Sequence, residues 1–184
     1  MKRKFALFES YLASLFSKNP NLKIKLKKYY LKIFYYTFYF FKFTKKAITP
    51  YEIGRVGSLT SETYFGYYDI SPQNEDGLLL CHQSQIHTNR IPKRGDSINV
   101  VVFKKDDFIN PYREYPTSAF NWQQGSRAQW LNSRLIIFND YNAQLESYVS
   151  KIYDIFDDRL VKEIKYPTQI AYKDIFYVSL NYDH

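Results

Sequence analysis

The 184-residue sequence predicts a mostly β protein preceded by an α-helical N-terminal arm that is basic and aromatic. Short strands that are apolar on both faces recur downstream of the arm, and turn residues separate them. The positive charge is concentrated in residues 1–46, which contain twelve Lys or Arg and one acid, Glu9. Residues 47–184 contain 14 Lys or Arg and 17 acids, so the basic character belongs to the arm and not to the body.

The arm, residues 1–46, contains two segments with helical patterns. Residues 3–17 place apolar side chains on one stripe, and the stretch Asn19–Asn21 ends this helix before a second one at 22–46. Between Lys32 and Lys42 lie nine uncharged, mostly aromatic residues. They would rise about 14 Å as a helix, which is too short for a bilayer core of about 30 Å.

The second helix suits the interface of an anionic membrane, where lysines meet lipid phosphates and aromatic rings lie at headgroup depth. Packing against protein and binding of single-stranded nucleic acid are alternatives. Nucleic acid is disfavoured because Arg3 is the arm's one arginine, and arginine makes the best phosphate and base contacts. Glu9 interrupts the first apolar stretch and no clean cleavage site follows, so we expect an uncleaved, cytoplasmic protein peripheral at the inner membrane face. The expected membrane contacts are Lys25, Lys28, Lys32, Phe34, Tyr35, Phe38, Phe41 and Lys42.

The body follows a connector at 47–63 and alternates strand and turn signals. Pro72 and the pair Asp76–Gly77 mark one turn, Asn132–Ser133 marks a tight hairpin, and Pro116 indicates an edge strand. Leu135–Phe138 is apolar at every position, so both faces of this strand must be covered. The predicted strands are 64–70, 78–82, 98–103, 113–119, 126–131, 134–139, 147–155, 159–166, 169–172 and 175–180.

The spacing of the buried strands predicts a partial β-propeller. Strand centres at Leu79, Ile136 and Phe176 recur after 57 and 40 residues, and propeller blades repeat at about 40–50 residues. The blades are expected at 64–119, 126–166 and 168–184, about two and a half four-stranded units. Because so few blades cannot close a ring, the chain is expected to be the N-terminal piece of a longer protein or a truncated reading frame. A central strand of an ordinary β-sandwich is the alternative for the buried strands.

Five motifs, FGYYDISP, DG-LLLCH, NRIPKRGD, NWQQGS-AQWL and IIFND, give the body a family resemblance. It resembles bacterial propeller proteins of the WD40-like or TolB-like kind that are associated with surface-polysaccharide genes. The resemblance covers Ser61 to His184, and it implies a propeller fold in a carbohydrate context. It implies no catalytic residue, and the chain departs from the family in having few blades.

A candidate carbohydrate site lies around Asn121–Gly125. Amides and an indole ring offer directional hydrogen bonds and a flat apolar face, which suit a sugar ring. The alternative is that the amides bond to neighbouring backbone and the Trp fills the core. The expected substrate-binding residues are Trp122, Gln123, Gln124, Arg127, Asn89 and Arg90.

Candidate catalytic groups are fewer. Asp69 and Asp140 could form a carboxylate pair acting on a glycosidic bond, or each could hold a turn through backbone N–H groups. Cys81–His82 is disfavoured as a nucleophile pair because adjacent strand residues face opposite ways, and His82 with Gln83 and Gln85 is disfavoured as a metal site for the same reason. We expect no metal and no cofactor.

The sequence therefore favours a non-catalytic carbohydrate-related binding or scaffold module of bacterial surface-polysaccharide biosynthesis, whose partner is a carbohydrate or glycan precursor. An enzyme that transfers, eliminates or hydrolyses glycosyl groups in a polysaccharide is the main alternative, so enzymatic activity is left open. A defunct fragment is a third interpretation. The one cysteine excludes an internal disulfide and fits a reducing compartment.

Overall fold

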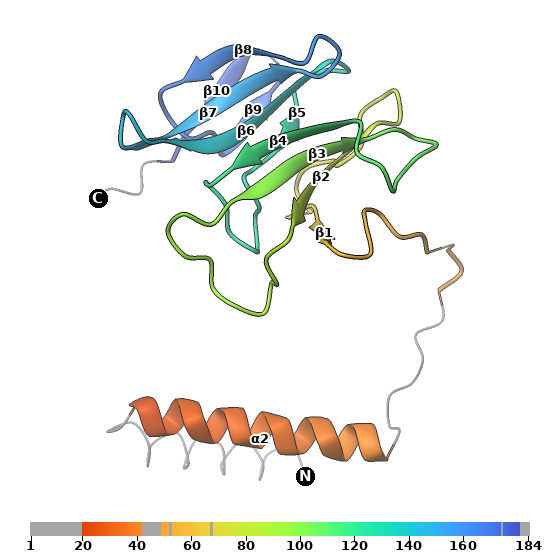
Figure 1. The fold of residues 1–184 in the computed structure, drawn as a ribbon, viewed down its shortest axis with the longest axis vertical. Coiled ribbons are helices and arrows are strands. Elements are labelled where there is room, and N and C mark those ends of the chain that lie inside the picture. Colours follow the sequence, from red (N-terminus) through yellow and green to blue (C-terminus); the bar gives the residue numbers. More distant parts are fainter. Residues whose placement is uncertain (1–19, 42–48, 52, 67, 174, 181–184) are drawn as a thin grey trace. The chain divides into compact units, whose positions relative to one another are not determined.

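The computed structural model describes residues 20–41, 49–51, 53–66, 68–173 and 175–180. These residues form one helix, α2, and ten strands in three antiparallel sheets (Figure 1). The chain divides into two compact units, Met1–Glu52 and Ile53–His184. The boundary falls inside the predicted connector at 47–63, while the proposed blade limits stay predictions.

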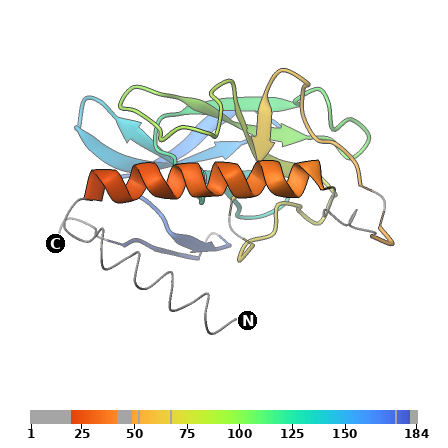
Figure 2. The ribbon, with the colours of Figure 1, turned by 90° about the horizontal axis from the view of Figure 1, so that it is seen from below.

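Helix α2 spans Pro20–Phe40 and is continuous in both views (Figures 1 and 2). Pro20 suits the first position because the first turn of a helix needs no backbone donor there. Described side chains from Ile24 to Phe41 are all exposed. The predicted helix at 3–17 and the end of the second helix, including Lys42, lie outside the described residues. Within the part of the chain that is described, no helix has the length and apolar character needed to cross a membrane.

The strands form two four-stranded meanders and a hairpin. Sheet order follows chain order, so each strand pairs with its neighbour in sequence, and none of the described sheets closes on itself. The first sheet contains β1 (Glu62–Tyr64), β2 (Leu79–Ser84), β3 (Ile98–Phe103) and β4 (Arg113–Thr117). The second contains β5 (Gln129–Trp130), β6 (Leu135–Asn142), β7 (Ser147–Asp154) and β8 (Arg159–Ile164), and the hairpin contains β9 (Ile170–Tyr172) and β10 (Phe176–Val178).

Strand β6 is covered on both faces, as its continuous apolar sequence predicted. Ile136 and Phe138 pack against Leu80 and Val100 of the first sheet. Ile137 faces the other way, into a cluster that includes Ala171 and Tyr177 of the hairpin. The prediction of a strand buried between two layers is therefore confirmed, and the three sheets are stacked through two apolar layers.

Most predicted strands differ from the structure by a few residues at their ends, and two differ more. The strand expected at 64–70 is wrong for the described residues after Tyr64, because Gly66 adopts a φ of 120° and turns the chain. The strand expected at 126–131 is reduced to Gln129–Trp130, because Arg127 has a φ of 56° that no extended strand allows. Pro116 lies on β4 at a sheet edge, as predicted.

Strand β2 places adjacent residues in different cores, as the sequence predicted. Leu80 belongs to the layer between the two large sheets, whereas Cys81 packs with Val101 and Phe103 on the outer face of the first sheet. His82 returns to the side of Leu80 and contacts Ser126. Cys81 and His82 therefore do not form a reactive pair.

Burial is expected to make Cys81 chemically inert. Its side chain is buried, and this burial raises the pKa of the thiol to about 12, so the thiolate at pH 8 is about a thousandfold scarcer than for an ordinary cysteine. We expect no measurable reaction with Ellman's reagent in the folded protein and stoichiometric reaction in guanidinium. Fast labelling of the native protein would show that the outer face of the first sheet is open.

Candidate functional site

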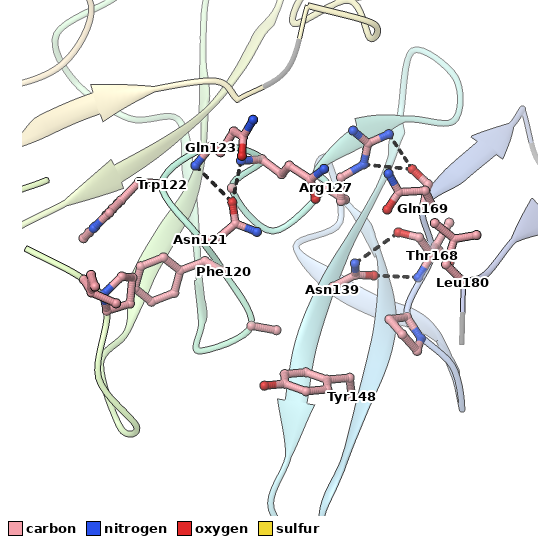
Figure 3. Close-up of a pocket in the computed structure, with 16 residues that line it drawn as sticks. Phe120, Asn121, Trp122, Gln123, Arg127, Asn139, Tyr148, Thr168, Gln169 and Leu180 are labelled. Atoms are coloured by element: carbon pink, nitrogen blue, oxygen red, sulfur yellow. Dashed lines mark hydrogen bonds between the residues drawn. The ribbon is translucent and has the colours of Figure 1, made fainter. Parts of the chain in front are cut away.

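A depression of about 700 Å³ lies where β6 ends and β7 begins (Figure 3). Its walls come from the loop at 119–127, from strands β6 and β7 of the second sheet and from the segment that precedes β9. Aromatic and aliphatic walls are supplied by Ile91, Pro92, Phe120, Trp122, Tyr148, Pro167 and Leu180, and polar groups by Asn121, Gln123, Gln124, Arg127, Asn139, Thr168 and Gln169.

A tight turn made by Asn121–Gly125 forms part of the wall of the depression. The side chain of Asn121 accepts hydrogen bonds from the backbone N–H groups of Gln123 (3.0 Å) and Gln124 (2.7 Å). The Gly125 N–H closes the turn on the carbonyl of Asn121 at 2.8 Å. The asparagine is thus used locally as an Asx turn, and the two glutamines are carried on a fixed backbone.

His82 lies directly behind this turn and joins it to the first sheet. The Ser126 N–H donates to His82 Nε2 at 3.0 Å, so Nε2 is unprotonated and Nδ1–H donates to the carbonyl of Phe65 at 2.9 Å. The ring stacks on Tyr64 with centroids 5.2 Å apart. Burial lowers the pKa of His82 to about 4, so the ring is neutral at physiological pH.

Arg127 joins the turn to the segment before β9. Its guanidinium donates to the carbonyl of Gln169 from Nε (2.9 Å) and from Nη2 (2.6 Å). It also forms an ion pair with Asp69, with Nη2 3.2 Å from Oδ2, although Arg127 is 6% exposed. A buried guanidinium needs such partners, because an unpaired charge costs several kcal/mol.

Trp122 and Arg90 were both predicted to bind sugar, but the polar groups of their side chains are engaged within the protein. The indole N–H of Trp122 donates to the Arg90 carbonyl, and its ring meets Tyr64 and Phe120 edge to face. The Arg90 side chain forms a two-pronged ion pair with Asp96 (2.7 and 3.0 Å), which lowers the pKa of that carboxyl to about 2. The indole N–H of Trp122 is therefore already bonded, and the ring alone is available to the depression. This agrees in part with the alternative in which the tryptophan fills the core.

Of the six residues predicted to bind sugar, four line the depression: Trp122, Gln123, Gln124 and Arg127. Asn89 and Arg90 do not line it, although the next two residues along the chain do. The sequence interpretation missed Phe120, Asn139, Tyr148, Thr168, Gln169 and Leu180. Asn139 carried a usable signal, since it is the first polar residue after the apolar run of β6, but the others are brought in only by long-range packing.

Asp69 and Asp140 do not line the depression, and each is paired with a cation. Asp140 accepts from Lys151 at 2.6 Å and from the Ser118 N–H at 3.1 Å. Burial by itself would raise the pKa of Asp140, but these hydrogen bonds outweigh it and hold the pKa below its ordinary value. Asp140 is therefore ionised near neutrality and unsuited to donate a proton as a general acid.

The histidine region shows no arrangement suited to a metal. Both ring nitrogens of His82 are engaged, and Gln85 is exposed. Among the residues that the structure describes, no three His, Cys, Asp or Glu side chains are grouped closely enough to hold an ion.

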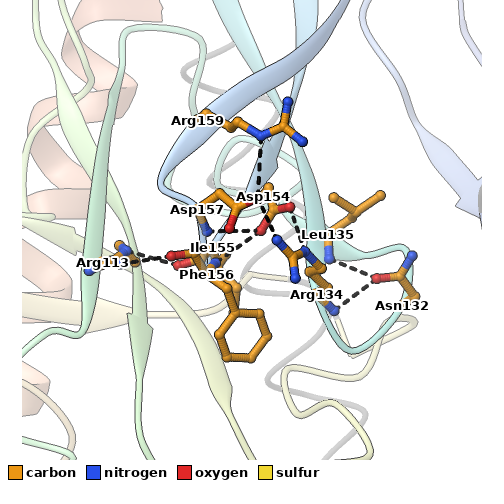
Figure 4. Close-up of polar contacts among 9 residues, drawn as sticks. All are labelled: Arg113, Asn132, Arg134, Leu135, Asp154, Ile155, Phe156, Asp157 and Arg159. Atoms are coloured by element: carbon orange, nitrogen blue, oxygen red, sulfur yellow. Dashed lines mark hydrogen bonds and ion pairs between the residues drawn. The ribbon is translucent and has the colours of Figure 1, made fainter.

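A second polar cluster lies at the opposite end of β6 and β7 (Figure 4). Arg134 pairs with buried Asp154 at 2.5 Å and with Asp157 at 2.6 Å. Arg113 of the first sheet donates from Nε to the Ile155 carbonyl at 2.8 Å. Since the Asp154 carboxylate also accepts a hydrogen bond from the N–H of Phe156, this cluster holds the turn after β7 and ties the two sheets together.

Comparisons of the chain with protein-family models, with curated proteins and with solved structures find no match. The interpretation of the depression therefore depends on its own geometry.

Proposed function

We propose that the β-rich unit, residues 53–184, is a carbohydrate-binding module that serves bacterial surface-polysaccharide biosynthesis. The observation that carries the proposal is the depression, which combines aromatic rings with amide groups. Tyr148 is 55% exposed and presents its ring, while Gln124 contributes a side-chain amide to the lining of the depression. Rings that cover the apolar face of a sugar and amides that bond its hydroxyls are what a glycan site needs.

The ionic groups near the depression support binding more than catalysis. Arg127 is held by Asp69 and by the Gln169 carbonyl, and Asp140 is held by Lys151. A pair of carboxylates that acts on a glycosidic bond needs one group free to donate a proton. We therefore prefer a binding function to the enzyme alternative.

The proposal includes the propeller architecture. Each four-stranded sheet is a consecutive antiparallel meander, the sheets stack face to face, and the hairpin β9–β10 begins a third unit in the same way. Propeller blades share this strand order and stacking, and strand ends are where propellers form their binding surfaces. The proposal further places the protein in the cytoplasm, peripheral at the inner membrane face through residues 1–46.

Removal of the ring or of the amide from the depression is expected to weaken glycan binding. For Tyr148→Ala and Gln124→Ala we expect about a fivefold loss of affinity each, because a ring contact or a hydrogen bond is worth about 1 kcal/mol. The ligand is first found on an array of bacterial surface oligosaccharides, and affinities are then measured by calorimetry.

Tyr166→Ala is the matched control, since Tyr166 is 68% exposed and does not line the depression. Its affinity should equal that of the wild type. Failure of the folded protein to bind any glycan on the array would contradict the proposal. Turnover of a bound glycan that is lost in Asp69→Asn or Asp140→Asn would establish the enzyme alternative instead.

A further inference from the structure

Helix α2 carries two stripes of different chemistry. Lys25, Lys28, Lys32, Tyr36 and Tyr39 follow one another at intervals of three or four residues, so they share one face, called here the lysine–tyrosine face. Tyr30, Phe34, Phe38 and Phe41 follow the same spacing two positions later, and they form the phenylalanine face. At 3.6 residues per turn, two positions correspond to more than half a turn, so the faces are nearly opposite.

Ring contacts along the helix reinforce the phenylalanine face. Tyr30 and Phe34 have centroids 4.8 Å apart, and Phe34 and Phe38 stack at 5.9 Å. The rings remain accessible, with Phe34 40% and Phe38 46% exposed. The helix therefore presents a continuous aromatic ridge that costs free energy in water.

The charge of the helix indicates what kind of partner covers this ridge. Residues 20–40 contain five lysines and no acid. On the lysine–tyrosine face, amines and phenol hydroxyls lie on the same side, with Tyr36 56% and Tyr39 72% exposed. A protein groove would cover one face, whereas a lipid interface suits both, because rings enter the acyl boundary while lysines and tyrosine hydroxyls stay among phosphates and water.

We infer that α2 lies flat in the surface of an anionic phospholipid bilayer, with the phenylalanine face inserted and the lysine–tyrosine face among the headgroups. This inference rests on the membrane location proposed above and names the lipid class, the inserted face and its residues. Lys27 precedes Tyr30 on the phenylalanine face, so the first turns lie closer to water than the rest.

The test measures co-sedimentation of the full chain with vesicles of phosphatidylcholine alone, or mixed equally with phosphatidylglycerol. The double substitution Phe34→Ala, Phe38→Ala should lower partitioning at least about tenfold, because apolar burial of the rings is lost. The matched control, Tyr36→Ala with Tyr39→Ala, removes two rings from the opposite face and should lower it about threefold or less. Helicity should persist in both, since alanine is the best helix former, and circular dichroism checks this.

Lys25→Gln, Lys28→Gln and Lys32→Gln together should cost on the order of a hundredfold on the anionic vesicles and little on neutral ones, because each lysine contributes about 1 kcal/mol near an anionic surface. Added salt should likewise release the wild type. Equal losses from the Phe pair and the Tyr pair would overturn the orientation. Absence of capture by anionic vesicles at low salt, or tighter binding to a single-stranded oligonucleotide, would overturn the membrane inference.

Glycan titration of the same variants separates the two proposals. The α2 variants should keep the wild-type glycan affinity, because the depression is built from residues 91–180. If the wild-type protein binds glycan but is not captured by vesicles, the membrane inference alone is contradicted. If it is captured by vesicles but binds no glycan, the glycan proposal alone is contradicted.

Discussion

Gly125→Ala is expected to destabilise the β-rich unit by about 3 kcal/mol or more, because a side chain there meets both backbone strain and a steric clash. Gly125 has a φ of 61°, and a Cβ atom would lie 2.5 and 2.6 Å from the two ring nitrogens of His82. The ring cannot retreat, since hydrogen bonds hold it to Phe65 and Ser126. Urea unfolding followed by tryptophan fluorescence measures the effect, and both tryptophans of the chain lie in this unit.

Gly95→Ala is the matched control. Gly95 also has a positive φ, 91°, but a Cβ atom there would have no neighbour within 4 Å. It should therefore show backbone strain alone, about 1–2 kcal/mol. Equal destabilisation by the two substitutions would show that His82 does not press on the turn at Gly125.

Acid should lower the unfolding free energy of the β-rich unit by about 3 kcal/mol through protonation of His82. Its pKa is about 4 in the folded protein and near 6.5 when the ring is exposed to water. Between these values the unfolded chain binds a proton that the folded chain does not, so the unfolding free energy is full above pH 6.5 and falls as pH drops toward 4. Protonation of Nε2 would also remove the acceptor for the Ser126 N–H.

His82→Gln isolates this contribution, because an amide does not titrate in this range. The variant should be less stable at pH 7 than the wild type, yet its unfolding free energy should change less between pH 6.5 and 4.5. Urea midpoints at several pH values provide the comparison. Parallel pH profiles for the two proteins would mean that His82 is not held neutral by burial.

Much of the strand pattern was predictable because it depends on local periodicity. Ile98–Phe103 was predicted at the bounds that the structure gives to β3, and Leu135–Phe138 was identified as covered on both faces. The errors fall where backbone conformation departs from regular structure, at Gly66 and Arg127. Such positions have no periodic signal, since a single residue with positive φ interrupts a strand without changing the alternation of apolar and polar side chains around it.

The candidate site was predictable in part. The turn at 121–125 was identified from its amides, indole and glycine, and its residues do line the depression. Asn89 and Arg90 were included because they are polar and lie in a loop, but Arg90 is occupied by Asp96 and by the Trp122 indole. The role of His82 in holding the turn was also missed, because the residue that it contacts, Ser126, is 44 residues away in sequence.

By itself, the sequence determined the elements: a lysine-bearing aromatic helix, apolar strands buried on both sides, and the turns between them. These follow from the spacing of side chains along one stretch of backbone, where helices repeat every 3.6 residues and strands every two. The tertiary structure alone decided which loops meet. It seated His82 behind Gly125, bound Arg127 to Asp69 and Gln169, and added Asn139 and Tyr148 to the walls of the depression. Those pairings join residues tens of positions apart, so they depend on how sheets stack rather than on any local pattern.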